Sequence, residues 1–154
     1  MPAMNDNVAI MTRFVDECWN LRNRSVCREM LAPEYEHYMP GAEQPTVGPD
    51  AYQQLVDGFL LGFPDTRFVI ENVFGEGHYV CMMWTVHATH TGDFNAIVPT
   101  NRPVVINGVG VARIVNGIIF RIDSYFDNDS FTRQLDAPAE KAAESWQRTT
   151  RQAS

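Results

Sequence analysis

Residues 103–127 have the sequence PVVINGVGVARIVNGIIFRIDSYFD, and this stretch decides the fold. The Asn-Gly pair at 116–117 separates two runs rich in β-branched residues, and such a pair accepts the two positive φ angles of a type I′ turn. The sequence therefore predicts a long β-hairpin whose register is set at this turn. Because side chains alternate along a strand, Gly108, Gly110 and Ala112 share one face. A face with so little side-chain bulk predicts the floor of a cavity.

The composition is that of one globular domain. The chain has 154 residues, of which 45% are hydrophobic and 20% are charged, and its formal net charge is -7. We expect a single domain over residues 1–136, followed by a tail at 137–154 that is helical or frayed. The acidic charge repels nucleic-acid phosphates and anionic membranes, so neither is expected as a partner. No segment reaches the ~18 consecutive apolar residues of a membrane-spanning helix.

Cysteine usage and the N-terminus bear on the compartment and on cofactors. Cys18, Cys27 and Cys81 are odd in number and lack metal-ligand spacing, so we expect buried free thiols, which suit a reducing compartment. The N-terminus has no basic region followed by an apolar run, so a cytoplasmic location is expected. No histidines and carboxylates have metal-ligand spacing, and no glycine-rich loop opens a helix. Neither a metal nor another cofactor is therefore expected.

Before the hairpin, the sequence predicts helices first and strands afterwards. Apolar residues at intervals of three and four indicate helices, and proline or glycine marks their ends. The predicted helices are one capped by Asn5 or Asp6 and running to Trp19, one at 26–31 and one at 49–63, with a short last helix at 130–135. The predicted strands are 67–74 and 79–92, and 34–39 is expected to be a short edge strand or an extended arm.

Helices that precede a run of antiparallel strands are typical of the α+β class. Long strands twist and coil, so the sheet should curl into a half-barrel around the helices and leave a hollow between them. The predicted shape is a cone with a pocket.

This order of elements and six short motifs resemble the SnoaL-like polyketide cyclases of the nuclear transport factor 2-like superfamily. The motifs are GPDAY at 48–52, FPD at 63–65, ATHTG at 88–92, PTNR at 99–102, RIVNG at 113–117 and FTRQL at 131–135. The resemblance implies the cone-shaped fold. It also implies an intramolecular aldol ring closure without metal or cofactor, in which an aspartate near the end of the last strand is acid and base and two histidines assist. In this chain the aspartate position is Ser124 and the histidine positions are Ile122 and Gly110.

Two carboxylates lie close to the changed positions. Asp123 is one residue from the expected place, and the family also tends to carry an acid at Asp127. In a regular strand Asp123 and Asp127 would share a solvated face with Arg121, opposite the face that holds Phe120, Ile122, Ser124 and Phe126. A bulge of one residue between 122 and 125 would instead turn Asp123 into the pocket.

Histidines and large side chains supply the other candidates. His90 ends an apolar strand face and is either a proton carrier or a structural histidine bonded to the next loop. His37 and Tyr38 alternate in direction, so one of them points to the pocket. The resemblance places a polar pocket residue at His37 and pocket-lining side chains at Trp19 and Leu55, which are otherwise plain core. We expect the apolar walls to be formed by Trp19, Leu55, Phe59, Trp84, Phe120 and Phe126.

These residues favour a cofactor-independent cyclase or isomerase that transfers protons on a hydrophobic, polyketide- or terpenoid-like molecule. Its acid or base would be Asp123 or Asp127, and His37, His90 or Ser124 would be the hydrogen-bonding partner. The first alternative is a non-catalytic binding or dimerising module on the same fold. An epoxide hydrolase or epoxide-opening cyclase is the second, although the strand at 79–92 lacks the Arg and Asp expected for it.

A homodimer is the predicted assembly. An apolar outer hairpin face is too hydrophobic to remain in water, and we expect it to consist of Val105, Val109, Val111, Val115 and Ile119.

Overall fold

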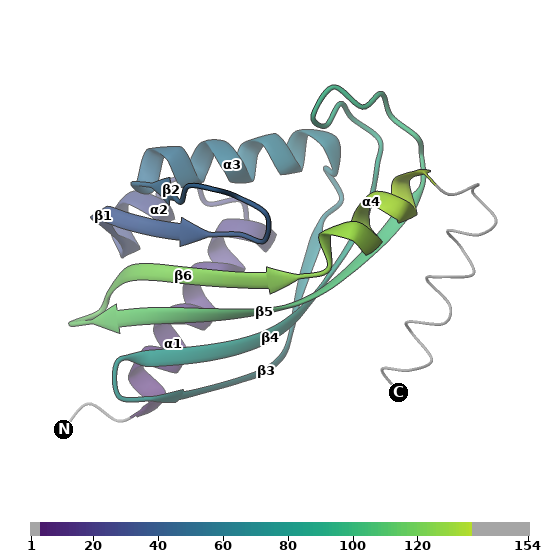
Figure 1. The fold of residues 1–154 in the computed structure, drawn as a ribbon. Helices are drawn as coiled ribbons and strands as arrows, with labels where there is room; N and C mark the ends of the chain where they lie inside the picture. Colours follow the sequence, from purple (N-terminus) through teal and green to yellow (C-terminus); the bar gives the residue numbers. More distant parts are fainter. Residues whose placement is uncertain (1–3, 137–154) are drawn as a thin grey trace.

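The computed structural model of the chain describes residues 4–136 and has the expected α+β architecture. A curved sheet bends around α1 and α3, and α4 follows the last strand at one end of the sheet (Figure 1). The predicted tail at 137–154 lies outside the described residues. The elements are α1 (Met4–Val15), the π-helical turn η1 (Asp16–Asn20), α2 (Val26–Met30), β1 (Leu31–Tyr38), β2 (Thr46–Val47), α3 (Pro49–Gly62), β3 (Arg67–Glu76), β4 (Tyr79–Thr89), β5 (Pro103–Val115), β6 (Ile118–Phe126) and α4 (Asn128–Asp136).

The sheet has six strands in the order β2-β1-β6-β5-β4-β3. Its pairs are antiparallel except for β1 and β6, which run parallel. The edge position expected for residues 34–39 is wrong, because β1 lies between β2 and β6. Pro33 is tolerated in β1 because the pairing with β6 is irregular between Leu31 and Glu36.

The hairpin of β5 and β6 confirms the predicted turn. Asn116 and Gly117 have φ angles of 50° and 80°, as a type I′ turn requires. The hairpin has a bulge close to this turn, outside the 122–125 segment where one was considered, because Arg113 pairs with Arg121 whereas Ile114 pairs with Ile119. Phe120 is therefore the extra residue, and Ile119 points into the core instead of outward.

The predicted bare strip on β5 is present, but only part of it is open. Gly108 pairs with Trp84 across β4 and β5, and the indole covers it so closely that an added Cβ would lie 2.2 Å from Trp84 Cζ2. Gly110 has no atom within 3.6 Å of the corresponding Cβ position. Ala112 is fully buried in the main core. The Trp84 indole thus packs on Gly108, and Gly110 is the part of the strip that forms the floor of a cavity.

The helix α4 closes one end of the sheet. Its apolar side chains Phe131 and Leu135 pack into a second cluster with Phe63, Val86 and Val104. Its Gln134 side chain accepts a hydrogen bond from the Val105 N–H (2.7 Å) and donates one to the Val105 carbonyl (2.9 Å). Gln134 therefore satisfies the backbone of β5 where β6 has ended. None of the helices within residues 4–136 is long and apolar enough to span a bilayer.

Candidate functional site

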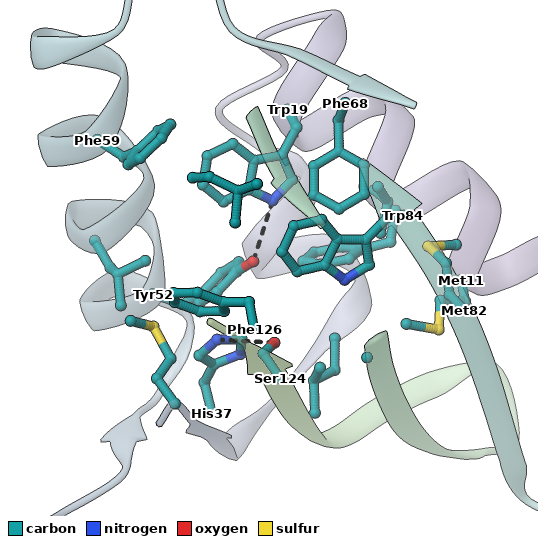
Figure 2. Close-up of a pocket in the computed structure, with 17 residues that line it drawn as sticks. Met11, Trp19, His37, Tyr52, Phe59, Phe68, Met82, Trp84, Ser124 and Phe126 are labelled. Atoms are coloured by element: carbon teal, nitrogen blue, oxygen red, sulfur yellow. Dashed lines mark hydrogen bonds between the residues drawn. The ribbon is translucent and has the colours of Figure 1, made fainter. Parts of the chain in front are cut away.

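A cavity of about 130 Å³ lies between the helices and the concave face of the sheet. Figure 2 shows its side chains converging from α1, η1, β1, α3 and the sheet on one central space. The lining residues are Met11, Phe14, Val15, Trp19, His37, Met39, Tyr52, Leu55, Phe59, Phe68, Met82, Trp84, Ile106, Gly110, Ile122, Ser124 and Phe126. No Asp, Glu, Lys or Arg belongs to this lining.

His37 is the polar centre of the cavity. Its side chain is 5% exposed, and β1 pairs it with Ile122 of β6, which brings it beside Ser124. Burial lowers the pKa of His37 to about 4, and Asp123 on the other face of the sheet opposes this shift only in part. The ring is therefore neutral at pH 7, so one of its nitrogens can accept a proton.

Each ring nitrogen of His37 has a hydroxyl neighbour. The Tyr35 hydroxyl oxygen, which is not part of the cavity lining, lies 2.9 Å from Nδ1. Ser124 Oγ lies 3.5 Å from Nε2 (Figure 2). Tyr35 is fully buried, and burial raises its pKa well above the usual value. It stays protonated and fixes the ring orientation through Nδ1. Nε2 is the nitrogen that faces the cavity.

A second polar pair, formed by Trp19 and Tyr52, lies beside His37. The Trp19 Nε1–H donates to the Tyr52 hydroxyl oxygen over 3.3 Å. Burial raises the pKa of Tyr52, so its own hydroxyl hydrogen remains available as a donor. The Tyr52 and His37 rings lie 4.8 Å apart between centroids. The cavity thus combines one neutral imidazole with the hydroxyls of Tyr52 and Ser124.

Asp123 is not part of this cavity. Its carboxylate accepts two hydrogen bonds from the Arg121 guanidinium, at 2.8 and 2.9 Å, on the outer face of the sheet. The same guanidinium lies 4.0 Å over the ring of Tyr38, which also faces outward. Of the two alternatives for Asp123, the solvated face shared with Arg121 is the one found; the bulge that would turn Asp123 inward is absent, because pairing is regular from Arg121 to Phe126.

Asp127 caps a helix. Its Oδ1 accepts a hydrogen bond from the Ser130 N–H (2.9 Å), and its carbonyl accepts one from Phe131. These are the free backbone donors of the first turn of α4. Asp127 does not line the cavity.

His90 and Phe120 also lie elsewhere. His90 is fully buried, stacks on Phe63 at 5.1 Å and is bonded through Nδ1 to Thr100 of the following loop, as the structural interpretation expected. The bulge turns Phe120 to the outer face, where the Arg113 guanidinium lies 5.5 Å from its ring. Phe120 is thus not a cavity wall.

The other candidates meet in the cavity. They are Trp19, His37, Leu55, Phe59, Trp84, Gly110, Ile122, Ser124 and Phe126. Tyr35 was not among the residues predicted for the site, and Tyr52 was noted only as the last residue of the GPDAY motif. Tyr35 is two residues before His37, so strand alternation was the signal that could have placed both on one face. Within residues 4–136, no three His, Cys, Asp or Glu side chains gather as metal ligands would.

The family model of the SnoaL-like polyketide cyclases matches residues 9–135. The chain belongs to the SnoaL-like polyketide cyclase family. This membership supports an enzyme of cyclase or isomerase type that acts on a small molecule. No curated protein matches the sequence.

Solved structures share the fold. A candidate SnoaL-like polyketide cyclase from Jannaschia sp. CCS1 is 24% identical, with a TM-score of 0.82 over 90% of this chain and 96% of that one. AclR, a candidate hydroxylase from Streptomyces galilaeus, is 24% identical, with a TM-score of 0.76 over 88% and 100%. A Catenulispora acidiphila protein with a ketosteroid isomerase-like fold is 12% identical, with a TM-score of 0.69 over 85% and 95%. These similarities confirm the predicted cone-shaped fold. The fold alone does not define the reaction, which has to be argued from the residues of the site.

Proposed function

We propose that this SnoaL-like protein is a cofactor-independent cyclase or isomerase that moves a proton on an uncharged, hydrophobic carbonyl compound of the polyketide or terpenoid kind. His37 is the proton carrier in this proposal. The observation that carries it is the neutral, buried imidazole whose Nε2 faces a cavity without a charged side chain. His37, and not Asp123 or Asp127, is assigned the role of acid and base because both aspartates lie outside the cavity.

The proton transfer uses the two hydroxyls of the cavity. The proposal uses the tautomer of His37 whose hydrogen is on Nδ1, where it can be donated to the Tyr35 oxygen at 2.9 Å. The Nε2 lone pair then takes a proton from the carbon next to the carbonyl group, so a C–H bond breaks and an N–H bond forms. The electron pair moves to the carbonyl oxygen, which accepts hydrogen bonds from Tyr52 or Ser124. The negative charge that develops beside the imidazolium raises the pKa of His37 while the reaction proceeds.

The proton then returns by one of two routes. In an isomerisation, His37 gives it to a different carbon of the same enolate. In a ring closure, the enolate carbon forms a bond to a second carbonyl carbon of the ligand, and His37 protonates the oxygen of that carbonyl. Aromatic and methionine walls hold the ligand folded and keep water out, which favours either route over protonation of the enolate by water.

The charge of the ligand tests this proposal directly. A cavity without a cationic partner makes an anionic ligand lose its hydration without compensation. Acetophenone and benzoate have similar size and differ in charge, so acetophenone should bind at least about tenfold more tightly at pH 7, equivalent to about 1.4 kcal/mol. Isothermal titration measures both dissociation constants, and a preference for benzoate would overturn the proposal.

A non-catalytic binding module is the second candidate function. One observation favours it: the positions where the family resemblance expects an aspartate and two histidines hold Ser124, Ile122 and Gly110. A binding module would take up the ketone without exchanging its α-hydrogens. The epoxide-opening alternative has no support here, because it needs an acid and the cavity lining holds no carboxylate.

We also propose that the outer sheet face forms a homodimer. Met83, Val109 and Tyr125 are direct neighbours across β4, β5 and β6, and Met83 and Tyr125 are 45% and 61% exposed. Phe74 and Tyr79 extend this apolar face. Two such faces bury each other in a symmetric dimer. Light scattering should give twice the chain mass, and Val109→Lys should give the monomer; a wild-type monomer contradicts the proposal.

A further inference from the structure

The Trp84 indole forms part of the cavity wall and is fixed by contacts with Gly108, Phe68 and Phe126. It rests on Gly108, where a Cβ would come within 2.2 Å of Cζ2, and its ring centroid lies 5.1 Å from that of Phe68 and 6.1 Å from that of Phe126. Trp84 packs against both hydrophobic clusters of the protein. The indole therefore lies where the cavity wall meets the second cluster, and Figure 2 shows it above the space that Ser124 and His37 face.

The cavity floor at Gly110, beside the indole, has more free space than Gly108 has. A Cβ at Gly110 would find the Met11 methyl carbon at 3.6 Å and Ile122 Cγ2 and Trp84 Nε1 each at 3.8 Å. Met11 is a flexible side chain that adapts to its neighbours. Trp84 is thus the rigid group that limits the space above the bare backbone of β5.

The volume sets the size of what fits. The cavity measures about 130 Å³. An engineered protein cavity of about 150 Å³ holds one benzene molecule, whereas pockets for drug-sized ligands measure about 300 Å³ or more. By this comparison the cavity has room for one six-membered ring with a short substituent and too little for a second fused ring.

We propose that Trp84 determines ligand specificity by size, and that the buried part of the ligand is a single six-membered ring bearing a carbonyl group. This inference rests on the proposed function and adds the class of ligand. Gly108 makes this size limit possible, because any side chain at position 108 would displace the Trp84 indole from its place in the cavity wall.

Acetophenone and 2-acetonaphthone test the inference because they share an acetyl group and differ by one fused ring. Isothermal titration should show that the wild-type protein binds acetophenone at least about tenfold more tightly than the naphthyl ketone, a difference of about 1.4 kcal/mol. In Trp84→Ala the order should reverse, because removing the indole opens the space over Gly108. Trp84→Phe should give an intermediate ratio of the two dissociation constants. Because it keeps an aromatic ring in the core, it also serves as the test if the alanine variant does not fold.

Met83→Ala is the matched control, since Met83 is the next residue of β4 and points to the outer face. It should leave the ratio of the two dissociation constants as in the wild type. An unchanged ratio in both Trp84 variants overturns the inference and leaves the proposed function standing. Failure of the wild-type protein to bind either ketone overturns the proposed function together with the inference.

Discussion

The Tyr35 hydroxyl oxygen and His37 Nδ1 lie 2.9 Å apart behind the cavity, and both side chains are almost fully buried. This contact leaves Nε2 as the nitrogen that faces the ligand. It couples the local geometry of β1, where the two residues share a face, to the chemistry of a cavity whose other lining groups carry no charge.

Tyr35→Phe removes the partner of Nδ1. A buried nitrogen without a hydrogen bond costs about 1–3 kcal/mol, so the free energy of unfolding should fall by that amount. Urea denaturation followed by circular dichroism measures it. The control is Tyr38→Phe, which removes the hydroxyl of an outward-facing tyrosine bonded to Glu36 and should change stability little. Equal losses in the two variants would contradict the buried contact.

The low pKa of His37 makes stability depend on pH. The unfolded chain binds a proton at this residue below about pH 6.5, whereas the folded protein does so only below about 4. Stability from this group is therefore complete above pH 6.5 and is lost as the pH falls toward 4, by about 3 kcal/mol in total. His37→Gln should flatten the pH dependence of the unfolding free energy in this range. A slope retained in His37→Gln would disprove the assigned pKa.

Gly108 and Trp84 should be energetically coupled. Gly108→Ala forces the indole off the strand and should destabilise the protein by about 1–3 kcal/mol, as overpacking does. In a Trp84→Ala background the added methyl group meets no ring, so the same substitution should cost far less. A double-mutant cycle by urea denaturation measures this difference. Strictly additive losses would show that the indole does not rest on Gly108.

Ser124→Asp places a carboxylate beside His37, at the position where the family resemblance expects an aspartate. Ser124 Oγ is 3.5 Å from Nε2, and an opposite charge at this distance stabilises the imidazolium. The pKa of His37 should rise above 4, as measured by NMR titration of the ring protons. Ser124→Asn has the same shape without the charge and should not raise the pKa. A rise in both variants would point to altered solvation instead of charge.

Local signals made much of the fold predictable. The turn at Asn116 and Gly117 could be predicted because both of its φ requirements are met by adjacent residue types. The bulge at Phe120 was missed, although Ile119 and Ile122 are both buried and two residues three apart cannot share a face of a regular strand. Helix ends and strand ends differed from expectation by a few residues, as at Met30, where helix passes into β1 one residue earlier than expected.

The site was less predictable because it depends on contacts between distant parts of the chain. His37 meets Ser124, 87 positions away, only because β1 inserts beside β6 in parallel, and no local pattern specifies that pairing. Of the two alternatives for Asp123, the outward one holds for a local reason. Arg121 is two residues away on the same outer face and binds both carboxylate oxygens.

The exchange of acetophenone methyl hydrogens for deuterium tests His37 as proton carrier most directly. In D₂O at neutral pD, the wild-type protein should accelerate this exchange, observed as loss of the methyl signal in proton NMR. His37→Gln should still bind acetophenone but exchange it at least about 100-fold more slowly, the usual minimum for loss of a general base. Exchange by His37→Gln at the wild-type rate, with acetophenone bound equally well, would contradict the account.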